Sequence, residues 1–223
     1  MPTNKIAMLF KSTIIALTFG VSSISGAAAL PGEGVEVQPL KSSIAEETFQ
    51  TLLVMKALER LGYDVQPIKE IEYAAGHIAI ANGDATFLAA HWDPLHVDFY
   101  EKAGGEEKLY RKGIYSPRGL QGYLIDKKTA DAHGIKILGQ FKDPKVAKLF
   151  DANGDGKADL TGCTPGWGCE KVIENHLDAY GLRDTVTHNQ GSYSAIIADT
   201  IARHKQGEPI FFYTWTPYWV SGV

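Results

Sequence analysis

The chain has 223 residues, a formal net charge of −4, and a composition that is 44% hydrophobic and 22% charged. That apolar content is enough to bury a core in one large domain or two small lobes. The mild acidity and the lack of any Lys or Arg run argue against a nucleic-acid partner.

The first 27 residues have the pattern of a cleaved export signal. Lys5 and Lys11 supply positive charge, residues 13–21 form a short apolar run, and small residues follow it. The alternative, a membrane anchor, needs an apolar run of about 20 residues. We therefore expect an exported protein cleaved after Ala27, with Ala29 as the other candidate. Loss of two Lys and no acid changes the formal charge from −4 to −6.

Strand-like and helical segments alternate through the rest of the chain. Strands are expected at 35–37, 63–65, 85–90, 119–126, 186–187 and 209–215. Helices are expected at 43–61, 74–81, after Pro94, 127–133, from Asp143-Pro144, 170–180 and 192–204. This alternation predicts an α/β fold with largely parallel sheets. In such sheets, ligands bind outside the carboxyl ends of the strands.

The helix expected at 43–61 has a start signal, an apolar face and a stop signal. Ser43 and Glu46 have the spacing of a capping box, and Gly62 marks the end. Apolar residues recur at helical spacing on one face, namely Phe49, Leu52, Leu53, Leu58 and Leu61. Glu46 and Glu47 are interpreted as a cap and a solvated helix face rather than an acid–base pair.

A short loop holding Trp167 is closed by Cys163 and Cys169, the two cysteines of the chain. Two cysteines in an exported protein are expected to pair. So short a bridge stabilises the fold by about 2–2.5 kcal/mol in the loop-entropy model. Its larger effect is geometric, because it fixes an indole beside backbone N–H groups. Such a loop suits a ligand with a cationic head and an anionic tail.

Tryptophans fall late in expected strands or in loops, at Trp92, Trp167, Trp215 and Trp219. The ordinary role of a buried tryptophan is core packing. The alternative is a box of indoles that binds a quaternary ammonium group by cation–π attraction, about 2 kcal/mol or more per desolvated contact.

A carboxylate on the same ligand needs hydrogen-bond donors. His96 and the backbone amides of Gly168 and Cys169 are the candidates. The alternative for His96 is a surface histidine after a strand.

Residues 151–159 resemble a calcium-binding loop. Oxygen-bearing side chains occupy positions 1, 3, 5 and 9, at Asp151, Asn153, Asp155 and Asp159, with glycine at position 6. Position 12 is Gly162, where a calcium loop has a bidentate Glu. The segment is either a Ca²⁺-binding turn or a metal-free Asx-rich turn, and in both cases we expect it to be structural.

Catalytic motifs are lacking from the sequence. It has no G-x-S-x-G, H-E-x-x-H, C-x-x-C or phosphate-binding glycine loop. His91 and His96 lie five residues apart without a convincing third ligand, which disfavours a zinc site. A secreted, Ca²⁺-stabilised enzyme is kept as an alternative from another class.

The mature chain resembles the periplasmic glycine betaine/proline-betaine binding proteins of osmoprotectant ABC transporters, the ProX type. The resemblance covers nearly everything after residue 27. It rests on residues 30–32, 46–53, 83–87, 122–131, 151–169, 187–191 and 212–220.

The resemblance implies a two-lobed, type II-like periplasmic binding protein with its ligand between the lobes. Lobe one is expected at 28–118, lobe two at 119–218, and the start of a return to lobe one at 219–223. The family's tryptophan box falls on Trp92, Trp167 and Trp215, which leaves Trp219 as packing. Carboxylate contacts fall on the His96 side chain and the amides of Gly168 and Cys169, and the disulfide on Cys163 and Cys169.

The implied function is non-enzymatic capture of glycine betaine or a related quaternary-ammonium osmoprotectant for a membrane ABC permease. The protein is expected to be a monomer that requires no cofactor, with structural Ca²⁺ as an option. Members of the family continue past the segment that contains Trp215, so the return to lobe one is expected to be missing. The alternative is a truncated remnant that cannot bind. The residues do not separate glycine betaine from proline betaine or choline-like ligands.

Overall fold

The computed structural model describes residues 29–114 and 116–222. The predicted export signal and its cleavage site after Ala27 lie outside the described residues. Within the described ranges, no helix has both the length and the apolar character required to cross a membrane.

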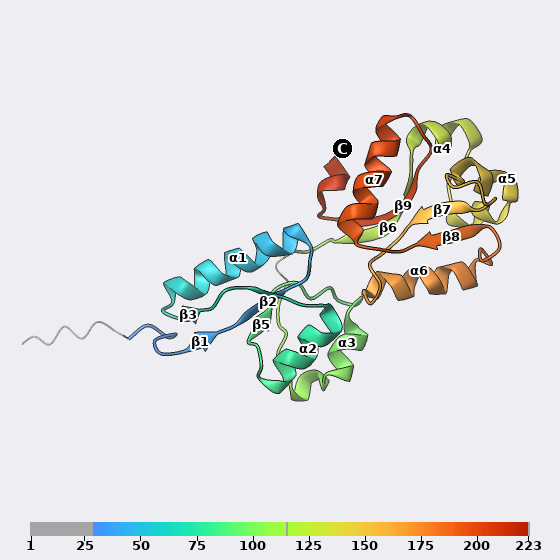
Figure 1. Ribbon diagram of the computed structural model, residues 1–223. Coiled ribbons are helices and arrows are strands. Elements are labelled where there is room, and N and C mark those ends of the chain that lie inside the picture. Colours follow the sequence, from blue (N-terminus) through green and yellow to red (C-terminus); the bar gives the residue numbers. More distant parts are fainter. Residues whose placement is uncertain (1–28, 115, 223) are drawn as a thin grey trace, which may run out of the picture.

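The first part of the chain forms a lobe, here called lobe one, of short parallel strands and helices (Figure 1). Its strands are β1 (Glu36–Val37), β2 (Pro39–Lys41), β3 (Asp64–Val65), β4 (Lys69–Glu70) and β5 (Phe87–Leu88). Its helices are α1 (Ala45–Arg60), α2 (Tyr73–Asn82), α3 (Val97–Lys102) and the 3₁₀ turn η1 (Gly105–Glu107). One sheet pairs β1 with β3, and the other has the order β4-β2-β5.

The second part forms lobe two around a sheet of order β6-β9-β7-β8 (Figure 1). Its strands are β6 (Leu120–Ile125), β7 (Ala158–Thr161), β8 (Val186–Asn189) and β9 (Phe211–Thr216). Its helices are α4 (Lys127–His133), α5 (Pro144–Ala147), α6 (Gly168–Ala179) and α7 (Tyr193–Lys205). Three further 3₁₀ segments lie in this part of the described chain, namely η2 (Leu138–Lys142), η3 (Lys148–Phe150) and, after β9, η4 (Trp219–Gly222).

The core of lobe two lies between its sheet and its helices. Phe150, Leu160, Ile173, Leu182 and Ile197 are each less than 2% exposed there. Burial of large apolar side chains is the dominant favourable contribution to folding. Lobe two therefore carries the best-packed core in the described chain.

The α/β prediction is confirmed, and so is the division into two lobes. Asp126 and Asp143 cap α4 and α5 by accepting backbone N–H bonds at 2.8 and 2.9 Å. The β6–β9 pair is antiparallel, whereas the other described pairs are parallel. The expected boundary between residues 118 and 119 stays a prediction.

The expected start and apolar face of α1 need correction. Its N-cap is Ile44, which makes no side-chain cap bond, and the helix begins one residue later than a Ser43 capping box requires. Instead, the Ser42 hydroxyl accepts the Ile44 N–H and donates to Glu47. The face buried against lobe one carries Glu47, Thr51 and Met55. Several of the predicted apolar residues are exposed, namely Phe49, Leu52, Leu53 and Leu61.

Candidate functional site

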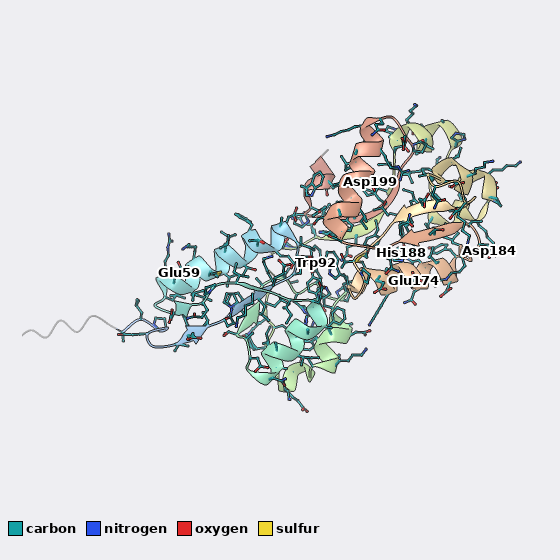
Figure 2. The ribbon with its side chains drawn as sticks, in the orientation of Figure 1. Glu59, Trp92, Glu174, Asp184, His188 and Asp199 are labelled. Atoms are coloured by element: carbon teal, nitrogen blue, oxygen red, sulfur yellow. A yellow bond between two sulfur atoms is a disulfide. The ribbon has the colours of Figure 1, made fainter. Side chains whose placement is uncertain are left out.

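A pocket lies where the two lobes meet. Figure 2 places Trp92 at this junction. Lobe one lines the pocket with Ile44, Tyr73, Trp92, Leu95 and His96. Lobe two lines it with Gln121, Trp167, Gly168, Cys169 and Trp215. The structure therefore brings all six predicted ligand-binding residues to one cavity.

Lobe two supplies two buried indoles to this pocket. Trp167 is the N-cap residue of α6, and Trp215 lies near the carboxyl end of β9. Their ring centroids are 6.1 Å apart at 67°, an edge-to-face arrangement. Tyr193 and Tyr218 support the Trp215 ring, with centroids 4.6 and 4.7 Å away. Both rings therefore belong to the core and also line the pocket, and their role in binding a quaternary ammonium group stays a prediction.

The predicted Cys163–Cys169 disulfide is confirmed, with 6.2 Å between the Cα atoms. Cys169 belongs to the first turn of α6, so the bridge holds the start of that helix to the loop. The first amides of a helix have no partner within it, and the helix dipole favours an anion there. The N–H groups of Gly168 and Cys169 are accordingly placed to bind a carboxylate.

Gly168 also lets the two lobes approach each other. A Cβ atom at this position would lie 2.7 Å from Leu95 Cγ and 3.0 Å from the Leu95 carbonyl oxygen. Leu95 belongs to lobe one, so a larger side chain at 168 would push the lobes apart. Glycine is therefore required at position 168 for close approach of the lobes, in addition to any role of its backbone N–H.

Lobe one supplies Trp92 and His96, which follow β5. The Trp92 backbone N–H donates to His96 Nδ1 at 3.2 Å, which assigns the ring proton to Nε2. His96 is only 1% exposed, so the surface alternative for it is wrong. Burial holds the pKa of His96 well below its ordinary value, with smaller contributions from His91 and His77. The side chain is therefore a neutral N–H donor at pH 7.

Two carboxylates near the pocket were missed or misread in the sequence. Glu72 Oε2 accepts the Trp167 Nε1–H at 2.9 Å, a hydrogen bond that crosses from lobe two to lobe one. Glu47 is 2% exposed and accepts a hydrogen bond from the Tyr73 hydroxyl at 2.5 Å. The interpretation of Glu47 as part of a solvated face is wrong, because the inward side of α1 is set by tertiary packing.

Burial raises the pKa of Glu47, and hydrogen bonds from Ser42, Tyr73 and Trp92 oppose that rise. This carboxyl group sits in a network that also touches the pocket-lining Tyr73 ring. No sequence motif marks it. In the sequence Glu47 is only the second of two acidic residues in the first turn of a helix, a position where a carboxylate is usually solvated.

Trp219 stays outside the pocket, as expected for the fourth tryptophan. Its side chain is 48% exposed, and its ring centroid lies 5.8 Å from that of Tyr218. The Trp219 backbone N–H donates to Glu46 Oε1 at 3.2 Å. This contact joins the segment after β9 to α1 of lobe one.

The loop at 151–159 folds back on its own backbone. Asp151 accepts the N–H groups of Gly154 and Gly156 at 2.7 and 2.9 Å. Asp159 is buried and accepts the N–H of Ala152 at 2.7 Å and the Asn189 amide at 2.9 Å. These bonds join the loop to β8 and so brace the segment that leads into the disulfide loop. Both alternatives, a Ca²⁺-binding turn and a metal-free turn, stay predictions.

The reason given against a histidine metal site needs correction. His91 and His96 do have a third histidine beside them, His77 of α2. One nitrogen atom from each ring lies within 4.8 Å of the other two. Nothing in the sequence pattern singled out His77, because it lies 14 residues before His91 and meets it only in the folded lobe.

A family model for the substrate-binding domain of the ABC-type glycine betaine transport system matches residues 36–223. The chain belongs to this family. The glycine betaine-binding periplasmic protein OusX of Dickeya dadantii is 61% identical over 210 residues, which are 94% of this chain and 63% of that protein. The glycine betaine/proline betaine-binding periplasmic protein of Escherichia coli is 58% identical over 212 residues, 94% of this chain and 64% of that protein.

Solved members of this fold support the two-lobed architecture. A glycine betaine, L-proline-binding protein from Borrelia burgdorferi matches with a TM-score of 0.71 and 21% identity, over 84% of this chain and 65% of that chain. Lactococcal OpuAC in a closed conformation with glycine betaine matches with a TM-score of 0.68 and 19% identity, over 84% and 67%. These likenesses confirm the predicted periplasmic-binding fold. The chain spans 63–64% of the length of the curated relatives.

Proposed function

We propose that this chain is a non-enzymatic, periplasmic substrate-binding protein that captures glycine betaine or a related quaternary-ammonium osmoprotectant for an ABC importer. One observation carries the proposal. Three indoles, a neutral buried histidine and the first amides of a helix all line one pocket between two lobes. Family membership and the names of the relatives agree with it.

The indoles of Trp92, Trp167 and Trp215 bind the methylated cation. A quaternary ammonium group has no N–H to donate, so aromatic faces and the exclusion of water are what a protein can offer it. Glu72 accepts a hydrogen bond from the Trp167 indole N–H, which fixes the plane of that ring in the closed pocket.

The carboxylate of the ligand is bound by donors from both lobes. His96 offers its Nε2–H from lobe one, and Gly168 and Cys169 offer backbone N–H groups from lobe two. Because His96 stays neutral, its proton is available without the cost of burying a second cation. A ligand with both groups therefore contacts both lobes and favours their approach.

Two side-chain contacts cross between the lobes beside the pocket. Trp167 donates to Glu72 at 2.9 Å, and Lys171 Nζ lies 3.4 Å from Asp98 Oδ2. The first is partly buried, whereas both side chains of the second are exposed and contribute little. We infer that the Trp167–Glu72 bond forms as the lobes close on the ligand.

The test is calorimetric titration of the purified mature chain with glycine betaine, followed by tryptophan fluorescence. Trp167→Ala should weaken binding at least about tenfold, more than about 1.4 kcal/mol, because an indole face and its hydrogen bond are lost. Trp219→Ala is the matched control, since Trp219 is half-exposed and does not line the pocket. Unchanged affinity in folded Trp167→Ala contradicts the box assignment.

Absence of binding by a folded wild-type chain favours the other reading, a binding-incompetent remnant of such a protein. Sequencing of the downstream reading frame then shows whether a further segment accompanies this one. Turnover of a substrate that is abolished by a chelator would support the enzyme alternative.

The remaining features of the proposal concern processing and partners. We propose cleavage after Ala27, lobes at 28–118 and 119–218, and a return to lobe one that starts at 219–223. The partners are the betaine ligand and the membrane permease of the importer, and the protein acts as a monomer. The mass of the exported chain tests the cleavage site.

No cofactor is required for this binding, but we propose a structural Ca²⁺ ion on Asp151, Asn153, Asp155 and Asp159. A carboxylate oxygen has two lone pairs, so it can accept a backbone N–H and still bind a cation. Millimolar Ca²⁺ should raise the thermal midpoint of EDTA-treated protein, and Asp155→Asn should reduce that rise. No shift in the wild-type chain favours the metal-free turn.

A further inference from the structure

We propose that His77, His91 and His96 form a binding site for a divalent d-block cation such as Zn²⁺, distinct from the betaine pocket but sharing His96 with it. One nitrogen atom of each ring lies within 4.8 Å of the other two. Three imidazoles with an open fourth position are a common ligand set for such ions, and carboxylate-free nitrogen sites exclude Mg²⁺ and Ca²⁺.

The three rings come from two separate segments of lobe one. His77 lies within α2, whereas His91 and His96 belong to the loop between β5 and α3. Ring centroids are 5.2 Å apart for His77 and His91, 5.7 Å for His91 and His96, and 6.0 Å for His77 and His96. This triangle needs only a small contraction to place three nitrogen atoms about 2.0–2.1 Å from one ion.

His77 already has the outer hydrogen bond that is typical of a metal ligand. Its Nδ1 lies 2.7 Å from the Tyr73 carbonyl oxygen, so Nδ1 carries the proton and donates. Its Nε2 is therefore an unprotonated acceptor, and it lies 3.0 Å from His91 Nδ1. The proton between these two nitrogen atoms occupies the position that a cation takes over.

The cluster is sheltered from bulk solvent. His77 and His96 are 4% and 1% exposed. Few water molecules therefore compete with the imidazole nitrogen atoms for a bound ion.

When the ion binds, the ring protons of His91 and His96 can stay on their imidazole rings. When His91 Nδ1 binds the ion, its proton moves to Nε2, which now accepts from Arg111 Nη1 at 3.2 Å. Arg111 must then withdraw, and it can, because it is partly exposed and paired with Asp93 at 2.8 Å. His96 must likewise give up the long 3.2 Å bond from the Trp92 N–H. Its proton stays on Nε2 if Nδ1 binds the ion and moves to Nδ1 if Nε2 binds it.

The shared ring links the cation site to the pocket. His96 lines the pocket, whereas His77 and His91 do not. An ion that engages His96 draws on the donor proposed for the ligand carboxylate and on the bond that anchors Trp92. Zn²⁺ should therefore weaken betaine binding, a consequence that rests on the proposed function.

The direct test is calorimetric titration of untagged, EDTA-treated protein with Zn²⁺ alone at pH 7. His77→Phe and His91→Asn should each weaken binding at least about tenfold, since even an outer-sphere change costs about 10–100-fold. His133→Gln is the matched control, because His133 is exposed and far from the cluster. Arg111→Gln should tighten binding, as it removes a positive charge and frees His91 Nε2.

Co²⁺ on the wild-type chain gives a second readout, because an intense visible absorption band reports four-coordinate nitrogen ligation. Zn²⁺ affinity in His77→Phe and His91→Asn that equals the His133→Gln control overturns the site. So does the lack of a Co²⁺ band in folded wild-type protein. If Zn²⁺ binds as expected and glycine betaine does not bind at all, the metal site stands and the proposed function fails.

Discussion

The interiors of lobe one and lobe two differ in composition. Lobe two closes a four-stranded sheet over fully buried apolar side chains such as Phe150, Leu160 and Ile197. Lobe one has mostly two-residue strands, and its most buried side chains include Ser42, Glu47, Thr51 and His96. Meanwhile its helix α1 exposes Phe49 and Leu53, at 64% and 57%.

This difference in burial indicates that lobe two contributes more of the folding free energy than lobe one. Apolar burial stabilises lobe two in proportion to the area removed from water. Much of the interior of lobe one consists of hydrogen-bonded polar groups. Such groups contribute little net stability, but removing one partner is strongly destabilising because it leaves the other buried and unpaired. Trp167 and Trp215 therefore stand on the apolar core of lobe two, and lobe one carries the titratable His96 on its side of the pocket.

The sharpest test of this comparison uses a matched pair of Leu→Ala changes. Leu160→Ala in β7 should lower the free energy of unfolding by about 2–5 kcal/mol, because a fully buried side chain leaves a cavity. Leu53→Ala on α1 should change it by less than about 0.5 kcal/mol, because the side chain is 57% exposed. Urea unfolding followed by circular dichroism measures both.

A large loss in Leu53→Ala would break the comparison, because it would mean that the outer face of α1 is covered in solution. Equal small losses in both variants would mean that lobe two is not the stabilising unit. Phe49→Ala provides a second exposed position on the same helix.

The contact between the lobes gives a test of intermediate size. Glu72→Ala removes the acceptor of the Trp167 indole N–H and should weaken glycine betaine binding about fivefold, or about 1 kcal/mol. Glu72→Gln keeps a side-chain oxygen acceptor and should lose less. Calorimetric titration measures both affinities.

The order of these two variants carries the information. If Glu72→Ala binds as tightly as the wild-type chain, the bond does not contribute to closure. If Glu72→Gln loses as much affinity as Glu72→Ala, the negative charge of Glu72 matters in a way that hydrogen bonding does not explain.

The smallest effect concerns the pH dependence of lobe one. His91 and His77 have pKa values below the ordinary 6.5, and that of His91 is about 4. Well above pH 6.5 these two rings are neutral in both the folded and the unfolded chain, so their protonation costs no stability there. As the pH falls toward 4, the unfolded chain binds protons that the folded chain does not, so the free energy of unfolding falls. His91→Asn should make this decline shallower.

Thermal midpoints between pH 7 and pH 4 measure that slope. The raised pKa of Glu47 adds a slope of opposite sign, which His91→Asn leaves unchanged, so the difference between the two proteins reports on His91 together with its smaller effect on the pKa of His96. Identical slopes in the two proteins contradict the assignment of a lowered pKa to His91.

The sequence was a good guide wherever the structure follows local rules. Caps at Asp126 and Asp143 act as their residue types indicate, and α1 ends just before Gly62, which has a φ of 90°. Strands β2, β4 and β7 were missed. The first two are very short, and β7 begins within the polar loop at 151–159, so none of the three has a clear alternation pattern.

Local sequence patterns predicted the α/β fold, the disulfide and the set of tryptophans, and resemblance to a known family supplied each proposed ligand-binding residue. The fold class follows from local hydrophobic patterns, and the disulfide and the tryptophan set follow from residue types that are rare in this chain. Only the tertiary structure decided that Glu47 faces inward, that Glu72 bonds to Trp167 across the lobes, and that His77 joins His91 and His96. Contacts between distant segments depend on how the elements pack, and no local sequence pattern encodes that packing.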